Sequence, residues 1–299
     1  MMGIYMLLAF CVIPPSPAGG SYLDLSSDAF YFAKDNPTLD KLLGDEWTIE
    51  MWFYIERFPS LPLRPFPKRN FSLILIKPGN YAIYLYSSRI EAETGPSIHE
   101  ALRAGAFFIK YKEMNLATGV GDTVAFNIPE DLLRKGFRGI TTKRWYHLAF
   151  QQKGRVVSAY INGVKEWDRR PIDPNLPHPK LDDLPTPLYI GHLPSAERFK
   201  NLFLEIMFGE KVESFKGAID ELRISNVARY GDGFVPPKRL EVDRYTMALW
   251  HFDEPLGSLS YEDASGNGNT LLSSRLLSVS LKADKASLWG RLKRGELDF

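Results

Sequence analysis

The chain has 299 residues, of which 44% are hydrophobic, 13% aromatic and 24% charged. This composition is that of an ordinary globular protein, and the length suits one large all-β domain or two smaller domains. The 37 basic and 36 acidic residues give a formal net charge of +1. Such a balanced charge offers no electrostatic basis for binding nucleic acid or an anionic membrane surface.

The N-terminus carries an uncharged run of ten residues, 4–13, which is too short to span a bilayer. Prolines end the run, and residues 16–18 (Ser-Pro-Ala) supply small side chains for a cleavage site. We predict a secretory signal peptide over residues 1–20, and hence a secreted, extracellular or cell-surface protein. A buried first strand is the alternative. The single cysteine, Cys11, lies in this run, so cleavage would leave a mature chain without disulfides or cysteine ligands.

The first half of the chain shows the two-residue period of β-strands. The clearest case runs from Trp47 to Ile55, where alternate residues divide between an apolar face, expected in the core, and a mixed face. The mixed face is expected to be partly wet and consists of Thr48, Glu50, Trp52 and Tyr54. We also predict a short helix near 98–103, another over 129–135, and strands at 21–27, 29–33, 71–77, 81–86, 105–112 and 120–128.

In the second half, residues 145–167 predict a three-stranded antiparallel meander. Asn162-Gly163 separates two apolar runs and favours a type I′ turn, in which both central residues need positive φ. Repeated prolines between residues 168 and 187 exclude a central strand there. Strands are predicted at 188–191, 215–224 and 246–252, and a single helical turn at 227–230. Many short strands with few helices predict an all-β fold with two antiparallel sheets packed as a sandwich.

Six short motifs follow one another along the chain. They are WTIEMW at 47–52, WYHLA at 145–149, AYING at 159–163, LYIG at 188–191, FKGAIDELRIS at 215–225 with ARY at 228–230, and ALWHFDE at 248–254 with DASGNGN at 263–269. In this order they resemble the laminin-G-like (LamG-like) jelly-roll domains of the concanavalin A-like lectin/glucanase superfamily, in their bacterial secreted form. The resemblance covers roughly residues 21–275.

The resemblance implies a single LamG-like jelly-roll domain over residues 21–275, followed by a C-terminal tail at 276–299. Within the domain, residues 246–275 are either the last strand or the remnant of a second repeat. The family often has a disulfide at the end of the sheet, which a mature chain without cysteine cannot form.

Asp220 is the most informative polar position, because alternation places it on one strand face with Ala218 and Leu222. A carboxylate on an apolar face needs a compensating donor or cation. The resemblance implies a structural Ca²⁺ near this strand and the first one, with Asp24 as the second carboxylate, since oxygen ligands suit calcium. The alternative is that backbone N–H groups or an arginine hold Asp220.

Aromatic side chains on strand faces offer a surface on which a sugar ring can stack. We predict ligand-binding roles for Trp52, Tyr54 and Trp167, with packing in the sheet as the alternative. Three histidines lie in or beside strand motifs and are expected to be bonded locally rather than to form a site: His147, His192 and His251.

No pattern of catalytic residues is present, so we expect no enzyme. Glycoside cleavage needs two carboxyl groups that converge across a cleft, and the adjacent Asp220 and Glu221 are expected on opposite sides of a strand. The predicted function, which rests on the resemblance, is a secreted non-catalytic recognition module for carbohydrate or for a cell-surface or matrix protein. The alternatives are a glycoside-active hydrolase or lyase on the same sandwich, and a structural or assembly domain of a surface protein.

Overall fold

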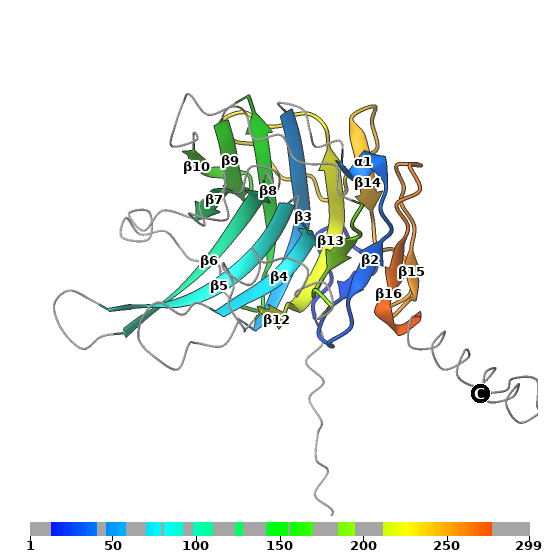
Figure 1. Cartoon of the computed structure of the whole chain (residues 1–299), viewed down its shortest axis with the longest axis horizontal. Helices are drawn as coiled ribbons and strands as arrows, with labels where there is room; N and C mark the ends of the chain where they lie inside the picture. Colours follow the sequence, from blue (N-terminus) through cyan, green and yellow to red (C-terminus); the bar gives the residue numbers. More distant parts are fainter. Residues whose placement is uncertain are drawn as a thin grey trace, which may run out of the picture.

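Two antiparallel β-sheets pack face to face in the computed structural model of the chain (Figure 1). The structure describes residues 13–40, 46–57, 70–78, 81–91, 98–109, 123–127, 142–154, 156–169, 185–194 and 212–276. Within these residues the fold is an all-β sandwich, which confirms the fold class predicted from the sequence.

Sheet A carries the strands that position the candidate site. Its strands lie in the order β1-β13-β3-β8-β9-β10, and β14 pairs with the same strand, β13, that pairs with β1. The bounds are β1 (Leu23–Asp24), β3 (Glu46–Arg57), β8 (Trp145–Lys153), β9 (Val156–Ile161), β10 (Val164–Arg169), β13 (Lys216–Ser225) and β14 (Thr246–Trp250).

Sheet B has the order β15-β16-β2-β11-β4-β5-β6-β7, and β12 pairs parallel with β4. Its strands are β2 (Tyr31–Ala33), β4 (Asn70–Lys77), β5 (Tyr81–Glu91), β6 (Ile98–Ile109), β7 (Thr123–Asn127), β11 (Leu188–Ile190), β12 (Val212–Ser214), β15 (Ser260–Tyr261) and β16 (Leu271–Ser273). A short helix, α1 (Pro37–Asp40), lies between β2 and β3 in the chain. None of the helices in the described part of the chain has the length and apolar content to cross a bilayer.

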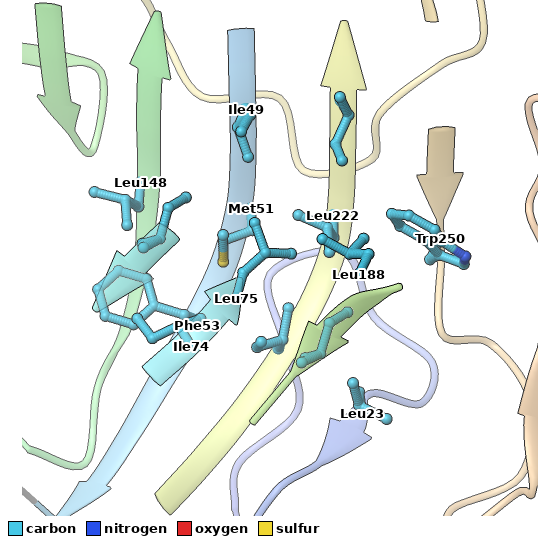
Figure 2. Packing of buried hydrophobic residues seen from close by; sticks show 14 of the residues in the cluster. Leu23, Ile49, Met51, Phe53, Ile74, Leu75, Leu148, Leu188, Leu222 and Trp250 are labelled. Carbon is cyan, nitrogen blue, oxygen red and sulfur yellow. The ribbon is translucent and has the colours of Figure 1, made fainter. Parts of the chain in front are cut away.

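The core lies between the two sheets, as the alternation on β3 predicts. Figure 2 shows Met51 and Phe53 of β3 near Leu75 and Ile74 of β4, and Leu222 of β13 near Leu188 of β11, all within one hydrophobic cluster. All five apolar residues at alternate positions of this strand are buried in the same hydrophobic cluster: Trp47, Ile49, Met51, Phe53 and Ile55. Burial of such side chains stabilises the fold by about 1.5–3 kcal/mol each.

The predicted meander forms from β8, β9 and β10. Asn162 and Gly163 have φ values of 50° and 78°, as a type I′ turn requires. The carbonyl oxygen of Gly163 also accepts a hydrogen bond of 2.9 Å from the backbone N–H of Phe234. The turn therefore closes the hairpin and anchors a distant loop.

Several local predictions differ from the structure. Residues 98–103 form part of β6 instead of a helix, because they pair with the whole outer half of β5. Residues 227–230 contain no helical turn. The first strand is limited to Leu23–Asp24, and the predicted helix at 129–135 lies outside the described residues.

Residues 246–273 supply β14 to sheet A and β15 and β16 to sheet B, so this region completes the sandwich.

Two glycines of the meander test how the turn anchors the loop. A Cβ at Gly163 would lie 1.8 Å from the carbonyl oxygen of Phe234, whereas a Cβ at Gly154, also at positive φ, meets nothing within 4 Å. We expect Gly154→Ala to cost about 1–2 kcal/mol from the left-handed backbone alone. Gly163→Ala should cost at least about 2 kcal/mol more, because the clash involves backbone. Urea unfolding of both variants measures the difference, and equal losses would contradict this account of the turn.

Candidate functional site

The outer face of sheet A is covered by two segments of the chain. We call residues 13–18 the N-terminal strap and residues 226–245 the covering loop. The mixed face of β3 was predicted to be partly wet, but the structure buries it beneath these segments; its four residues are Thr48, Glu50, Trp52 and Tyr54. The difference arises because both covering segments lie far from β3 in the sequence, where alternation gives no information about them.

A buried ion pair holds the covering loop. The guanidinium of Arg223 on β13 donates to Glu50 on β3 at 2.9 and 2.6 Å, and the hydroxyl of Tyr230 donates to the same carboxylate. His147 Nε2 lies 3.4 Å from it. Burial alone would raise the pKa of Glu50, but the contacts with His147 and Arg223 outweigh burial and hold this pKa below its usual value. Glu50 is therefore a charged structural centre.

Further hydrogen bonds tie the covering loop to sheet A and join its two ends to each other. The side-chain amide of Gln151 accepts from the Tyr230 N–H at 2.9 Å and donates to its carbonyl at 2.6 Å. Arg229 makes a bidentate contact with Asp243 at 2.9 and 2.8 Å. Trp52 Nε1 donates to the carbonyl oxygen of Pro237 at 3.1 Å. The indole of Trp52 is thus engaged in holding the loop and presents no open stacking surface.

A β-bulge on β13 sets the direction of its acidic residues. Glu221 has φ 52°, and the pairing register with β3 shifts between Asp220 and Arg223. Alternation alone placed Asp220 with Leu222, but the extra residue separates them: Leu222 enters the core, whereas Asp220 lies beside Trp52 on the outer face. The bulge also turns Glu221 toward the covering loop, where its carboxylate accepts from the Leu240 N–H at 2.7 Å. The expectation that Asp220 and Glu221 face opposite sides of the strand is therefore wrong, because the extra residue interrupts the alternation.

Asp220 is fully buried below the N-terminal strap. Its carboxylate accepts hydrogen bonds from the Ser16 hydroxyl and, at 3.0 Å, from the Glu221 N–H. Burial raises the pKa of Asp220 to about 7 against the opposing hydrogen bond from Ser16, and the charges of Glu221 and Asp253 act in the same direction as burial. The sequence analysis offered backbone N–H groups as an alternative partner for Asp220, and one such donor, the Glu221 N–H, is present.

The outer face carries three aromatic rings around Tyr54, which lies two positions along β3 from Trp52, the residue paired with Asp220. Trp145 at the start of β8 lies 5.9 Å from Tyr22 and 5.6 Å from Tyr54, measured between ring centroids. Tyr22 and Trp145 are half-buried, whereas Tyr54 is covered by Ile13 of the strap. We call Tyr22, Tyr54, Trp145 and Asp220 the Trp145 site.

The predicted ligand-binding residues have different surroundings. Tyr54 belongs to the Trp145 site, and Trp52 lies under the covering loop. Trp167 lies on β10 opposite Ala159, and its side chain is outside the part of the chain that the structure describes. The sequence analysis selected neither Trp145 nor Tyr22 as a site residue. The register Tyr54↔Trp145 between β3 and β8 is the signal that brings Trp145 to the site.

Two of the histidines have local partners, as expected. His251 Nδ1 lies 2.9 Å from Glu221, and His192 Nδ1 lies 3.2 Å from the Ser214 hydroxyl.

A second aromatic group lies on sheet B, where Phe32 on β2 is half-buried at 6.4 Å from Phe30 and 6.5 Å from Tyr189. A substitution at Phe32 can therefore serve as the control for a substitution at Trp145.

The two predicted calcium ligands each have protein donors. Asp24 Oδ1 accepts from the Ser26 N–H at 2.8 Å, and Asp220 is bonded as described above. Among the described residues, no group of three or more His, Cys, Asp or Glu side chains is arranged to hold a metal ion. Calcium binding therefore stays a prediction, since Ca²⁺ takes six to eight oxygen ligands and the described acidic side chains do not by themselves supply them.

Neither a family model nor a curated protein matches the chain. Solved structures do. A candidate carbohydrate-binding protein from Bacteroides ovatus matches with TM-score 0.46 and 16% identity, over 85% of this chain and 57% of that one. Domain 4 of an extracellular GH43 arabinanase from Geobacillus stearothermophilus, in complex with arabinotriose, matches with TM-score 0.28 and 20% identity, over 60% of each chain.

The LG4-5 domains of the mouse laminin α1 chain match with TM-score 0.41 and 12% identity, over 75% of this chain and 47% of that one. The chain spans less than two thirds of the length of each of these three structures. Their low TM-scores and identities assign no function to this chain.

The Glu50–Arg223 pair can be tested against an exposed pair of the same length. Glu50→Gln leaves Arg223 buried without its counter-charge and should cost about 3–5 kcal/mol. The Lys216–Asp28 contact is also 2.6 Å long but exposed, so Asp28→Asn should cost about 1 kcal/mol or less. Chemical unfolding monitored by tryptophan fluorescence compares the two variants. Similar losses would show that the buried pair does not hold the outer face.

The raised pKa of Asp220 predicts a dependence of stability on pH. The folded state binds the proton more tightly than the unfolded state, so stability from this group is present at low pH and is lost as pH rises through about 7. Relative to Asp220→Asn, the wild type should lose up to about 1.4 kcal/mol per pH unit between pH 5 and 7. Asp243→Asn serves as control, since the low pKa of Asp243 keeps it charged in this range. A flat difference for Asp220→Asn would refute the assignment.

Proposed function

We propose that this chain is a non-catalytic recognition domain that binds carbohydrate outside the cell or at its surface. The observation that carries the proposal is the Trp145 site, where three aromatic rings lie on the same sheet face as the buried carboxylate of Asp220, and one segment of chain contacts both. Ligand sites combine aromatic surface with a few polar groups that fix orientation. The LamG-like motifs of the sequence agree with this proposal.

A sugar ring matches this combination chemically. Its apolar C–H face packs on flat indole and phenol rings, which offer a large surface with a polar edge. Its hydroxyl groups are donors, and an ionised aspartate is an acceptor with two oxygens. Trp145 would supply stacking area and an N–H donor, and Asp220 would accept from a hydroxyl.

The contacts of the buried carboxylates support recognition over catalysis. Glu50 is bound by Arg223 and Tyr230, and Glu221 by the Leu240 N–H and His251. Glycoside cleavage needs one carboxyl that gives a proton and a second that acts on the sugar or on water. Acids bound by the protein's own donors are poorly placed for either task.

The proposal predicts which aromatic residue a glycan contacts. Trp145→Ala should weaken binding of the best glycan on an array at least about tenfold, or about 1.4 kcal/mol, because a tryptophan at a binding site contributes a large share of the free energy. Phe32→Ala, on the outer face of sheet B, should leave affinity unchanged. Isothermal titration measures both values, and near-UV circular dichroism checks the fold.

Loss of binding in the Phe32 variant instead would move the site to sheet B, and absence of binding to every glycan would reject carbohydrate in favour of a protein partner. The same titrations with and without EDTA test the predicted calcium. Affinity that falls on chelation and returns with added Ca²⁺ supports it.

A further inference from the structure

The N-terminal strap makes the contacts with the Trp145 site that a sugar would make. The hydroxyl of Ser16 donates to Asp220, and the carbonyl oxygen of Pro14 accepts from Trp145 Nε1 at 2.9 Å. The apolar side chain of Ile13 packs on Tyr54. One hydroxyl donor, one oxygen acceptor and one apolar surface thus face an acid, an indole N–H and an aromatic ring.

The sheet surface beneath the strap, which we call the floor, includes the carboxylate of Asp220 and is therefore not the apolar surface that a purely structural segment would cover. A segment that only stabilises a sheet face is expected to cover apolar side chains, because burying a charge is costly. Here the strap covers Asp220, and no ion pair compensates this carboxylate among the described residues. Removal of the strap would return the carboxylate of Asp220 to water. The cost of burying this carboxylate therefore favours release of the strap, whereas the packing of Ile13 on Tyr54 favours the bound strap.

The backbone beside the strap has the form of a hinge. Gly19 and Gly20 both have positive φ, at 81° and 76°, and the Gly19 N–H bonds back to the Ser16 carbonyl at 3.0 Å. Two consecutive glycines permit large backbone rotations at little cost. Pairing with sheet A begins only at Leu23, in β1. The strap is therefore joined to the body by a two-glycine turn outside the hydrogen-bonded sheet.

The charges around the floor restrict the ligand. Glu221 and Asp253 act on Asp220, and Arg239 is the cation near all three, in contact with Glu221 at 3.6 Å and with Asp253 at 2.6 Å. Among the described residues this region holds three carboxylates, the Arg239 guanidinium and the His251 ring in contact with Glu221, and this excess of acids disfavours a ligand that carries acid groups. A neutral oligosaccharide with free hydroxyls matches the floor, and a uronic acid chain does not.

We propose that the strap is a built-in substitute for a neutral oligosaccharide, and that the Trp145 site binds this ligand fully only when the strap leaves it. The inference rests on the proposed carbohydrate function. It adds the ligand class and a gate, by which we mean the strap that must leave the site before the ligand binds. The cleavage predicted at residues 16–18 would cut inside the strap. Processing there would open the site permanently.

Ser16→Asp in the full chain tests the gate, because it places a second carboxylate against Asp220 and should expel the strap. We expect the affinity for a neutral oligosaccharide, measured by isothermal titration, to rise at least tenfold. Ser27→Asp adds the same charge at an exposed serine away from the site and should change nothing. Combining Ser16→Asp with Trp145→Ala should abolish the gain. Ile13→Asp, which removes the packing on Tyr54, provides a second route to release if Ser16→Asp does not fold.

A synthetic peptide with the sequence of residues 11–20 supplies an independent readout. Added to the Ser16→Asp protein, it should compete with the oligosaccharide, and the same peptide with Ser16→Ala should compete less. If the released variants bind the sugar no better than wild type while Trp145→Ala still weakens binding, the gate is refuted and the carbohydrate function stands. If neither wild type nor released variants bind any neutral sugar, the ligand class and the release mechanism are refuted, whereas absence of binding to every glycan rejects the carbohydrate function as well.

Discussion

The buried ion pair between Glu50 and Arg223 is the contact on which the outer face of sheet A depends. Each of the two charges is buried away from water, which is tolerated because the opposite charge lies beside it. Further donors satisfy the remaining hydrogen-bonding capacity of the Glu50 carboxylate. One of these donors is Tyr230 of the covering loop, so the loop cannot leave without breaking the network. Around Glu50, sheet A is consequently buried on both faces, with apolar packing on one side and a polar network on the other.

The bulge at Glu221 extends this network toward the candidate site. One extra residue on β13 separates Asp220 from the core-facing Leu222 and moves both acids to the outer side of the sheet. Glu221 then binds the covering loop, while Asp220 remains below the strap. Bulges often lie near functional sites because they redirect a side chain without breaking the sheet. Here the redirected side chain is the acid of the Trp145 site.

Prediction from the sequence succeeded where neighbouring residues decide the outcome. The core face from Trp47 to Ile55 and the turn at Asn162-Gly163 depend on a two-residue period and on local φ values. It failed at 98–103, where pairing with β5 makes a strand of residues expected to be helical. It also missed Trp145 and Tyr22 as site residues, because their proximity depends on the pairing of β8 with β3 and on the placement of the strap.

The two-sheet class thus followed from patterns within short stretches, since alternation and turn chemistry are properties of consecutive residues. The accessibility of each outer-face residue was decided by the tertiary structure. Trp52 and Tyr54 belong to one strand face, yet one lies under the covering loop and the other under the strap. Ser16 and Asp220 meet across 204 positions of the chain. Such a contact exists only after the sheets have formed, so no local pattern specifies it.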